Sequence, residues 1–197
     1  MGKDVYVVVF DGFADWEPAH ALAELRRMAK REIVTVGFEA RPVISMGGLR
    51  VLPDRALAEV VPEALGLLIL PGGDVWAAGN HPQAQLGELL HRLNAGGIPI
   101  AAICGATIAL ARAGLLNDRR HTSTAPEDLH GAGPEYRGAV HYLPALAVTD
   151  RDVITASGFG SVEFAREVFS ALHVFSDSDE ALWFDTYKHG RLPGTTV

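Results

Sequence analysis

The residue best suited to nucleophilic chemistry is Cys104, the only cysteine among the 197 residues of the chain. It follows an apolar run over 98–103, and small residues surround it at Ala102, Gly105 and Ala106. This pattern predicts a strand, a tight turn and a helix, the geometry of a nucleophile elbow that raises a side chain above a sheet. We expect the N-terminus of the following helix to lower the pKa of the thiol. The alternative is a buried structural cysteine, a common fate of a free thiol.

A carboxyl group is predicted at the same edge of the sheet. Glu17 falls in the first turn of the helix expected after the first strand, with the apolar residues Phe13 and Trp16 nearby. A carboxyl group held against a thiol in apolar surroundings has a raised pKa and can share a proton with the sulfur. The alternative is an acid that only stabilises a helix N-terminus.

Two glycines follow another predicted strand directly. The backbone N–H of the second, Gly73, together with that of Gly105, is predicted to form an oxyanion hole; a simple turn is the alternative. Asp74 comes next, and His20 lies one helical turn beyond Glu17, so both are candidates for the pocket wall. A histidine in that position can also be a surface group.

Short apolar runs alternate with segments of helical periodicity along the chain. The alternation predicts a single-domain α/β fold with a flavodoxin-like, mostly parallel sheet, helices on both faces and reactive groups at the carboxyl ends of the strands. We expect an α/β domain over 1–175 and a helical extension over 176–197 that packs on the same domain or at a subunit interface. The predicted strands are 5–10, 33–36, 67–70, 98–103 and 153–156; the predicted helices are 16–30 (capped by Asp15), 82–95, 105–113, 161–172 and 178–188; short strands and turns are expected over 38–62 and 120–156.

Composition and charge narrow the classes of partner. The formal net charge is −7 and no run of Lys and Arg is present, so nucleic acid is not an expected partner. The apolar runs are far shorter than a membrane span, and one cysteine cannot form an internal disulfide, so we expect a cytoplasmic protein with no membrane partner. The remaining histidines show no ligand spacing, so neither a metal nor another cofactor is expected.

Four segments in this order resemble the DJ/PfpI superfamily, which has the class I glutamine-amidotransferase-like fold. They are Asp-Gly-Phe followed by Glu17, Leu-Pro-Gly-Gly at 70–73, Ala-Ile-Cys-Gly-Ala at 102–106 and Thr-Ala-Ser-Gly-Phe-Gly at 155–160. The resemblance runs from about residue 3 to 173. It implies that Cys104 is the nucleophile, that Glu17 is the family's glutamate, and that the protein is a homodimer.

The sequence departs from parts of this superfamily. Several relatives place a histidine about 20 residues after the cysteine, where this chain has Thr124; His121 lies three residues earlier and is either a general base or a structural histidine on a strand. PfpI-type proteases have a histidine directly after the cysteine, where this chain has glycine. Glutamine amidotransferases need glycines two residues either side of the cysteine, where this chain has Ala102 and Ala106. Both activities are therefore disfavoured.

The leading hypothesis is cysteine-dependent hydrolase or amidase chemistry, or glyoxalase or deglycase-like chemistry, on small carbonyl substrates in stress protection. Cys104 would attack the carbonyl and Glu17 would carry the proton. A second hypothesis is a redox-sensing or protective protein in which Cys104 is oxidised with little turnover. A third is a non-catalytic scaffold that binds a ligand or partner.

Overall fold

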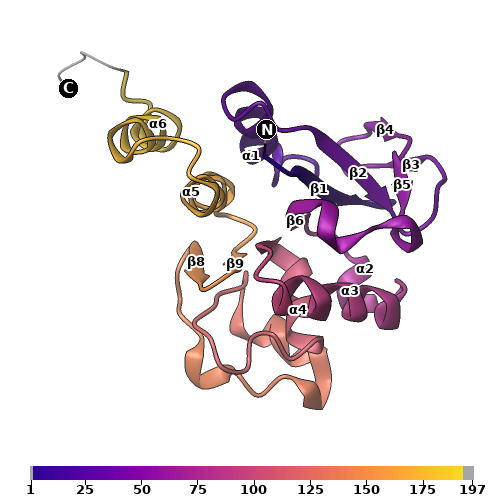
Figure 1. Cartoon of the computed structure of the whole chain (residues 1–197). Coiled ribbons are helices and arrows are strands. Elements are labelled where there is room, and N and C mark those ends of the chain that lie inside the picture. The colour runs from indigo at the N-terminus through magenta and orange to yellow at the C-terminus, as the bar shows by residue number, and fades with distance from the viewer. Residues whose placement is uncertain (1, 193–197) are drawn as a thin grey trace.

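The computed structural model describes residues 2–192, in which a seven-stranded sheet forms the centre of the molecule (Figure 1). Its strand order is β5-β2-β1-β6-β7-β9-β8, and only the pair β8 and β9 is antiparallel. The five inner strands follow the 2-1-3-4-5 order of flavodoxin-like folds, as predicted. A separate antiparallel pair, β3 with β4, lies outside this sheet. The strands are β1 Asp4–Val9, β2 Ile33–Gly37, β3 Val43–Ile44, β4 Arg50–Val51, β5 Arg55–Ala56, β6 Leu65–Leu70, β7 Ile100–Ile103, β8 Ala147–Asp150 and β9 Val153–Ala156.

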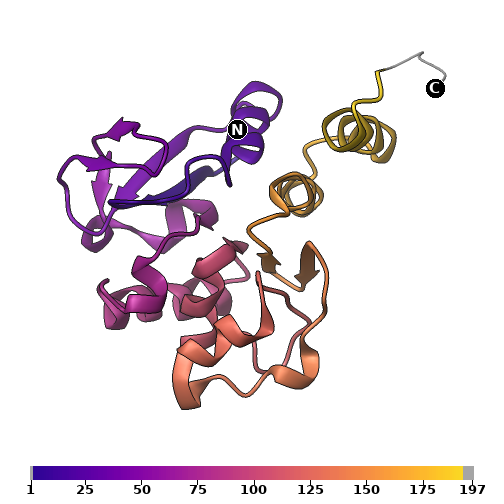
Figure 2. The same ribbon diagram turned by 180° about the vertical axis from the view of Figure 1, so that it is seen from behind.

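Helices cover both faces of the sheet, and Figures 1 and 2 show α1, α5 and α6 on one side and α2, α3 and α4 on the other. The α-helices are α1 Ala19–Arg27, α2 Val75–Ala78, α3 Gln83–Ala95, α4 Thr107–Arg112, α5 Ser161–Leu172 and α6 Asp177–His189. Short 3-10 helices are η1 Leu57–Glu59, η2 Pro62–Ala64, η3 Cys104–Ala106, η4 Pro126–Glu135 and η5 Ala139–His141. Of the helices between residues 2 and 192, none combines the length and apolar character needed to cross a membrane.

The inner strands are apolar at most positions because each face of the sheet is buried under helices. In β1, Val5 and Val7 pack with α1 and α5, whereas Tyr6 and Val8 belong to the cluster under α3 and α4. Successive side chains of a strand point to opposite faces, so a strand covered on both sides reads as a continuous apolar run. This explains why the strand positions predicted from the sequence agree closely with those of the inner strands.

The first helix differs from the prediction. It begins at Ala19 instead of residue 16, and Pro18, which lacks an N–H, occupies the position before it. Asp15 is not its cap. The Asp15 carboxylate accepts hydrogen bonds from Ser45 Oγ (2.8 Å) and Gly47 N (3.2 Å), in the loop between β3 and β4. Residues 15–18 therefore form a turn that carries Glu17 ahead of the helix.

The prediction of short strands over 120–156 is wrong for most of that segment. Its centre consists of η4 and η5, and β8 and β9 follow only from Ala147 onward. Pro126 starts η4, Gly133 adopts a positive φ of 80° and Pro134 follows it. Proline cannot donate to a strand ladder but fits the first turn of a helix, which explains the outcome.

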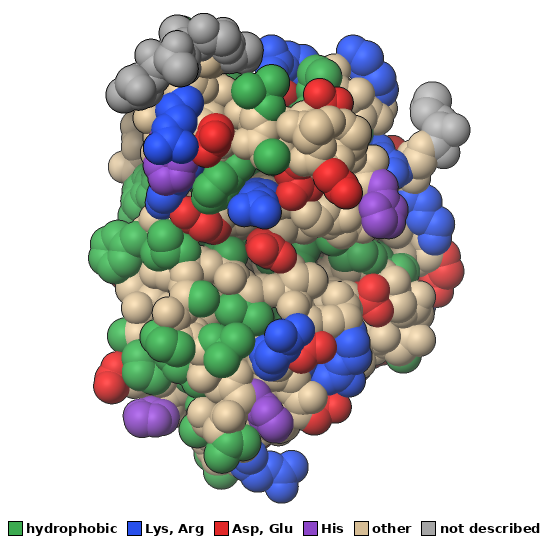
Figure 3. Space-filling view, turned by 90° about the vertical axis from the view of Figure 1, so that its left-hand side faces the viewer, with side chains coloured by type: hydrophobic (Ala, Val, Ile, Leu, Met, Phe, Trp, Pro, Cys, Tyr) green, Lys and Arg blue, Asp and Glu red, His purple; other side chains and the backbone are tan. Residues whose placement is uncertain are grey.

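The last helix is fastened to the rest of the molecule through α5. Trp183 of α6 is 7% exposed, and its ring meets Phe169 edge-on at a centroid distance of 4.8 Å. Lys188 also pairs with Glu163 at 2.7 Å. Figure 3 views the molecule from the left-hand side of Figure 1, and acidic and basic side chains are interleaved on that face. The contact between α5 and α6 thus combines an aromatic centre with ion pairs around it.

We expect Trp183→Ala to lower the free energy of unfolding by about 3 kcal/mol, because the substitution leaves a cavity between α5 and α6. Leu182→Ala is the matched control, since Leu182 is 43% exposed on the same helix and should cost less than about 1 kcal/mol. Urea unfolding of the full chain measures both. Equal losses for the two variants would show that α6 does not pack as described.

Candidate active site

Cys104 lies where β7 ends and the turn leading into α4 begins, and its backbone φ is +59°. Positive φ is uncommon for residues other than glycine and persists only where the surroundings hold it. Here Thr107 Oγ1 donates to the Cys104 carbonyl at 2.8 Å and also bonds with Ser123 Oγ at 2.8 Å. The side chain is half-buried. The structure therefore has the strand, tight turn and helix predicted around this cysteine.

Glu17 lies against the cysteine in a buried position. Its side chain is 1% exposed, and its Oε2 accepts a hydrogen bond from Gly72 N at 2.6 Å. The Cys104 thiol also donates to this carboxylate. Burial raises the pKa of Glu17 to about 7, and the hydrogen bonds from Gly72 and Cys104 lower it only in part. At neutral pH the site thus holds a carboxyl group close to half-protonation beside a thiol.

The thiol pKa is raised, contrary to the prediction. Burial is the largest cause, and the negative charge of Glu17 adds to it. Hydrogen bonds to the sulfur from Thr124 and from the Gly105 N–H act in the opposite direction but are smaller. The sequence indicated a helix N-terminus that favours the thiolate, but it did not show how deeply the sulfur would be buried.

Close approach at this site depends on glycine at two positions. A Cβ added to Gly72 would lie 2.7 Å from Glu17 Oε2 and 2.8 Å from Cys104 Cβ. A Cβ added to Gly158 would lie 3.0 Å from the Cys104 sulfur. These distances are shorter than, or at the limit of, normal packing, so a side chain at either place would displace the nucleophile or the acid. Gly72 and Gly158 follow β6 and β9, the two strands that flank β7.

The cavity above Cys104 has a volume of about 250 Å³. Gly73 and Gly105 both line it, and the Gly73 N–H makes no hydrogen bond to another group between residues 2 and 192. Asp74 lines the same cavity, as predicted, and Asp128 of η4 joins it from a different part of the chain. The arrangement brings a thiol, a carboxyl group and two backbone N–H groups together around one cavity.

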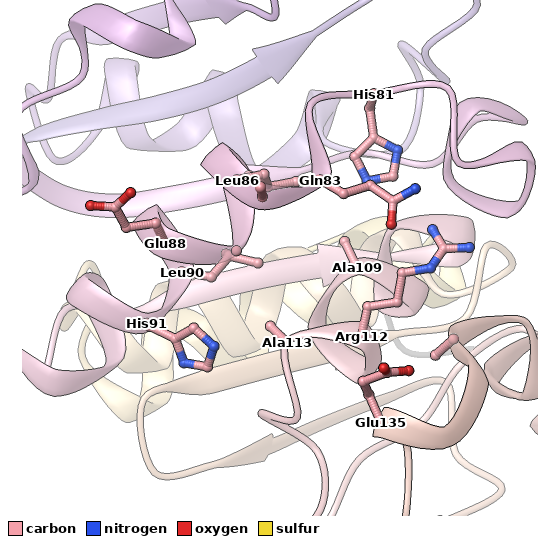
Figure 4. A pocket seen from close by; sticks show the side chains of 13 residues that line it. His81, Gln83, Leu86, Glu88, Leu90, His91, Ala109, Arg112, Ala113 and Glu135 are labelled. Atoms are coloured by element: carbon pink, nitrogen blue, oxygen red, sulfur yellow. The ribbon is translucent and has the colours of Figure 1, made fainter.

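A larger cavity, of about 410 Å³, lies between α3 and α4 (Figure 4). His81 and Arg112 lie at one end, and Glu88 and His91 lie at the other. Its lining has no thiol or hydroxyl group. Burial, with a smaller contribution from Arg112, lowers the pKa of His81, so that histidine is neutral at pH 7. We therefore place the reactive centre at Cys104, although its cavity is smaller. Among the residues that the structure describes, no three His, Cys, Asp or Glu side chains gather as a metal site requires.

The chain matches the DJ-1/PfpI family over residues 3–171. It belongs to this family. The curated relative "Uncharacterized protease YoaZ" of Bacillus subtilis is 36% identical over 195 residues, which cover 94% of this chain and 91% of that protein. "Deglycase TK1284" of Thermococcus kodakarensis is 30% identical over 67% of this chain and 80% of its own length. The crystal structure of the DJ-1 superfamily protein Atu0886 from Agrobacterium tumefaciens is 37% identical, has a TM-score of 0.87, and covers 96% of this chain and 100% of its own.

In this DJ-1/PfpI protein, His121 does not join the site. The side chain is completely buried; its Nδ1 lies 2.8 Å from the Arg119 carbonyl and its Nε2 lies 2.9 Å from the Tyr136 hydroxyl. Both ring nitrogens are therefore occupied away from Cys104, and burial lowers the pKa of the ring. Thr124 takes the expected position instead, with its hydroxyl on the sulfur. His121 is a structural histidine, the second reading of the sequence.

His20 is also separate from the cavity. Its ring packs edge-on against Trp183 and Tyr187 of α6, at centroid distances of 6.0 and 5.1 Å. Contributors to the site that were not predicted include Thr124, Gly158 and Asp128. Counting from the cysteine put Thr124 at the right distance along the chain, but nothing in the sequence gave its hydroxyl a role. Gly158 could also have been proposed from the sequence, because it comes shortly after a predicted strand.

The raised pKa of Glu17 makes stability depend on pH. An acid whose pKa rises from 4.5 to about 7 on folding binds its proton more tightly in the folded state. The free energy of unfolding therefore falls as the pH rises through this interval, by up to about 3 kcal/mol. We expect Glu17→Gln to remove this fall between pH 5 and pH 8 in urea unfolding. Glu127→Gln, at an exposed position, should keep it. A wild-type slope in Glu17→Gln would contradict the assignment.

Proposed function

We propose that this protein adds Cys104 to small aldehyde carbonyls, as a glyoxalase or deglycase-like enzyme acting in stress protection in the cytoplasm. The observation that supports this is a buried carboxyl group, Glu17, which is hydrogen-bonded to the thiol and whose pKa burial raises to about 7. One such group can both accept the thiol proton and return a proton to the substrate. The name of the Thermococcus kodakarensis relative, a deglycase, supports the same chemistry.

Peptide hydrolysis is the less favoured activity, even though the Bacillus subtilis relative is named a protease. Expulsion of an amine requires a strong proton donor beside the leaving nitrogen, and cysteine proteases use a histidine for this. The residues that line the cavity above Cys104 include no histidine, and His121 is occupied elsewhere. Addition to an aldehyde expels no leaving group, so it places smaller demands on the site.

The proposed reaction begins with transfer of the thiol proton to the Glu17 carboxylate while the sulfur bonds to the aldehyde carbon. The electron pair of the carbonyl bond moves to oxygen, where the N–H groups of Gly73 and Gly105 stabilise it. Glu17 then returns the proton to this oxygen, giving a hemithioacetal. With an α-oxoaldehyde, the same carboxylate can move the proton from the former aldehyde carbon to the neighbouring carbon, while the hydroxyl proton on the former aldehyde carbon passes to the neighbouring carbonyl oxygen. The resulting thioester is hydrolysed by water to a 2-hydroxy acid.

We expect wild-type protein to convert methylglyoxal to lactate and Cys104→Ser to be inactive. Glu17→Gln should lower kcat by about 10²- to 10⁴-fold, because it removes the proton carrier. Since Glu17 must be ionised to accept the thiol proton, kcat/KM should rise with pH through about 7. Conversion of the aldehyde and the pH profile are followed directly. His121→Gln is the control and should keep the profile if the protein remains folded. A profile that moves with His121 instead of Glu17 would sink the proposal.

A second candidate function is redox sensing through oxidation of Cys104. The hydroxyl of Thr124 and the N–H of Gly105 donate to the sulfur, and a protonated Glu17 would add a third donor. Such donors would stabilise the oxygens of a sulfinate, the second stage of thiol oxidation. In this role the protein would accumulate the oxidised form and show little turnover.

Mild peroxide treatment followed by mass spectrometry separates the two functions. If sensing is the function, we expect two oxygens to be added at Cys104, and Glu17→Leu to allow oxidation to pass to the third oxygen, because the hydrogen bond from the carboxyl group is lost. Methionine oxidation, measured on the same peptides, is the internal control. Unmodified Cys104 under conditions that oxidise exposed Met28 would argue against a sensor.

A further inference from the structure

An apolar groove of about 440 Å³ lies next to the cavity that contains Cys104. The two hollows meet at Thr124, which lines both of them. The groove does not contribute to any step described above. Phe159 and Leu146 both line the groove, with exposed fractions of 80% and 38%. We call this feature the Phe159 groove; its other apolar lining residues are Ala125, Pro126, Tyr142, Pro144 and Ala145.

The loop after β9 forms the boundary between the sulfur and the Phe159 groove. The Gly158 N–H donates to Thr124 Oγ1 at 3.0 Å, and Ser157 and Phe159 on either side of Gly158 line the groove. A Cβ at Gly158 would lie 3.0 Å from the Cys104 sulfur and 3.3 Å from Thr124 Oγ1. Glycine at this position therefore lets the loop lie directly against the sulfur. Because Thr124 and this loop adjoin both the sulfur and the groove, the groove is the neighbouring apolar surface for a group bonded to the sulfur.

The chemistry of the groove favours a neutral, apolar occupant. None of its lining residues is Asp, Glu, Lys, Arg or His. The four hydroxyl groups of its lining already have partners. Ser123 Oγ bonds with Thr107 Oγ1, Thr124 Oγ1 accepts from Gly158 N, Tyr142 OH donates to the Ser123 carbonyl, and Ser157 Oγ accepts from Phe159 N. The surface thus offers apolar contact and few free hydrogen-bonding groups. A charged substituent would lose its hydration there without gaining a partner.

The adjoining cavity adds a second restriction on charge. Glu17, Asp74 and Asp128 line it, and no Lys, Arg or His is among its lining residues. Carboxylates on this side disfavour a substrate that carries its own negative charge near the reacting carbonyl. Together the two hollows select for an uncharged carbonyl group with an apolar substituent.

We propose that the Phe159 groove binds the apolar substituent of the carbonyl substrate, so that uncharged aryl and longer alkyl α-oxoaldehydes are preferred to charged ones. This rests on the proposed function for its substrate class. The groove would hold the substituent while the carbonyl carbon faces the sulfur of Cys104. Phe159 is then a specificity-determining residue that takes no part in proton transfer.

Alkylation of Cys104 tests the groove independently of catalysis. The probes are N-methyl and N-hexyl iodoacetamide; the sulfur forms a bond to the methylene carbon, iodide leaves with the bonding pair, and the thiol proton passes to Glu17 or water. Rates are divided by those of N-acetylcysteine with the same probe. We expect the hexyl probe to react about tenfold faster than the methyl probe, a preference typical of a few buried methylene groups. Phe159→Ala should bring the ratio close to one.

Leu52→Ala is the control, because Leu52 is 67% exposed and lines neither hollow. It should keep the wild-type ratio. A ratio of one in the wild-type protein, or equal loss in both variants, would overturn the groove assignment. Light scattering is measured on the same samples. If Phe159→Ala splits a dimer and leaves the ratio unchanged, the groove belongs to an interface between copies and the proposal is wrong.

Turnover separates failure of the groove from failure of the proposed function. The substrates are methylglyoxal, phenylglyoxal and the anionic α-oxoaldehyde 4-carboxyphenylglyoxal. We expect Phe159→Ala to lower kcat/KM for phenylglyoxal about tenfold more than for methylglyoxal, and 4-carboxyphenylglyoxal to be the poorest substrate. Turnover of methylglyoxal without any effect of Phe159→Ala on phenylglyoxal would overturn the groove alone. No turnover of any aldehyde, with the alkylation preference intact, would overturn the proposed function and leave the groove in place.

Discussion

The hydrogen bond between the Cys104 thiol and the buried Glu17 carboxyl group is the interaction on which the candidate site depends. The buried carboxyl group of Glu17 is hydrogen-bonded to the half-buried thiol of Cys104; the charge of Glu17 raises the pKa of the thiol, whereas the thiol hydrogen bond lowers the pKa of Glu17. Neither group alone is unusual in a protein of this size. Together they place a carboxyl group with a pKa of about 7 beside a thiol, the pair on which both proposed functions depend. The surrounding architecture serves to keep these two groups in contact.

The sheet provides that contact through the order of its strands. Glu17 follows β1, the Gly72 amide follows β6, Cys104 follows β7 and Gly158 follows β9, and these four strands are consecutive neighbours. All four run parallel, so their carboxyl ends lie along one edge. Glycines on the two strands flanking β7 then permit backbone to approach the sulfur and the acid more closely than any side chain would allow.

Sequence patterns could predict which residues lie at the candidate site but not how their pKa values are shifted. The inner strands, Cys104, Glu17 and the glycine turns were predictable because apolar runs and turn residues are local signals. The direction of the thiol pKa shift was not, since it depends on burial from several elements at once. The substitution of Thr124 for a catalytic histidine was visible in the spacing, yet only the hydrogen bonds of His121 to Arg119 and Tyr136 show that it is structural. The 3-10 helices after Pro126 were not predicted, because such short helices produce no clear hydrophobic periodicity in the sequence.

The loop between β3 and β4 lies outside the main sheet but lines the cavity above Cys104. Asp15 holds this loop through Ser45 and Gly47, and Met46 between them lines the cavity above Cys104. One wall of the cavity above Cys104 thus comes from a small hairpin that is not part of the seven-stranded sheet. Changes in the length or composition of that hairpin can reshape the entrance while the proton-sharing pair stays intact. Family members with the same chemical centre are therefore free to diverge in what they admit.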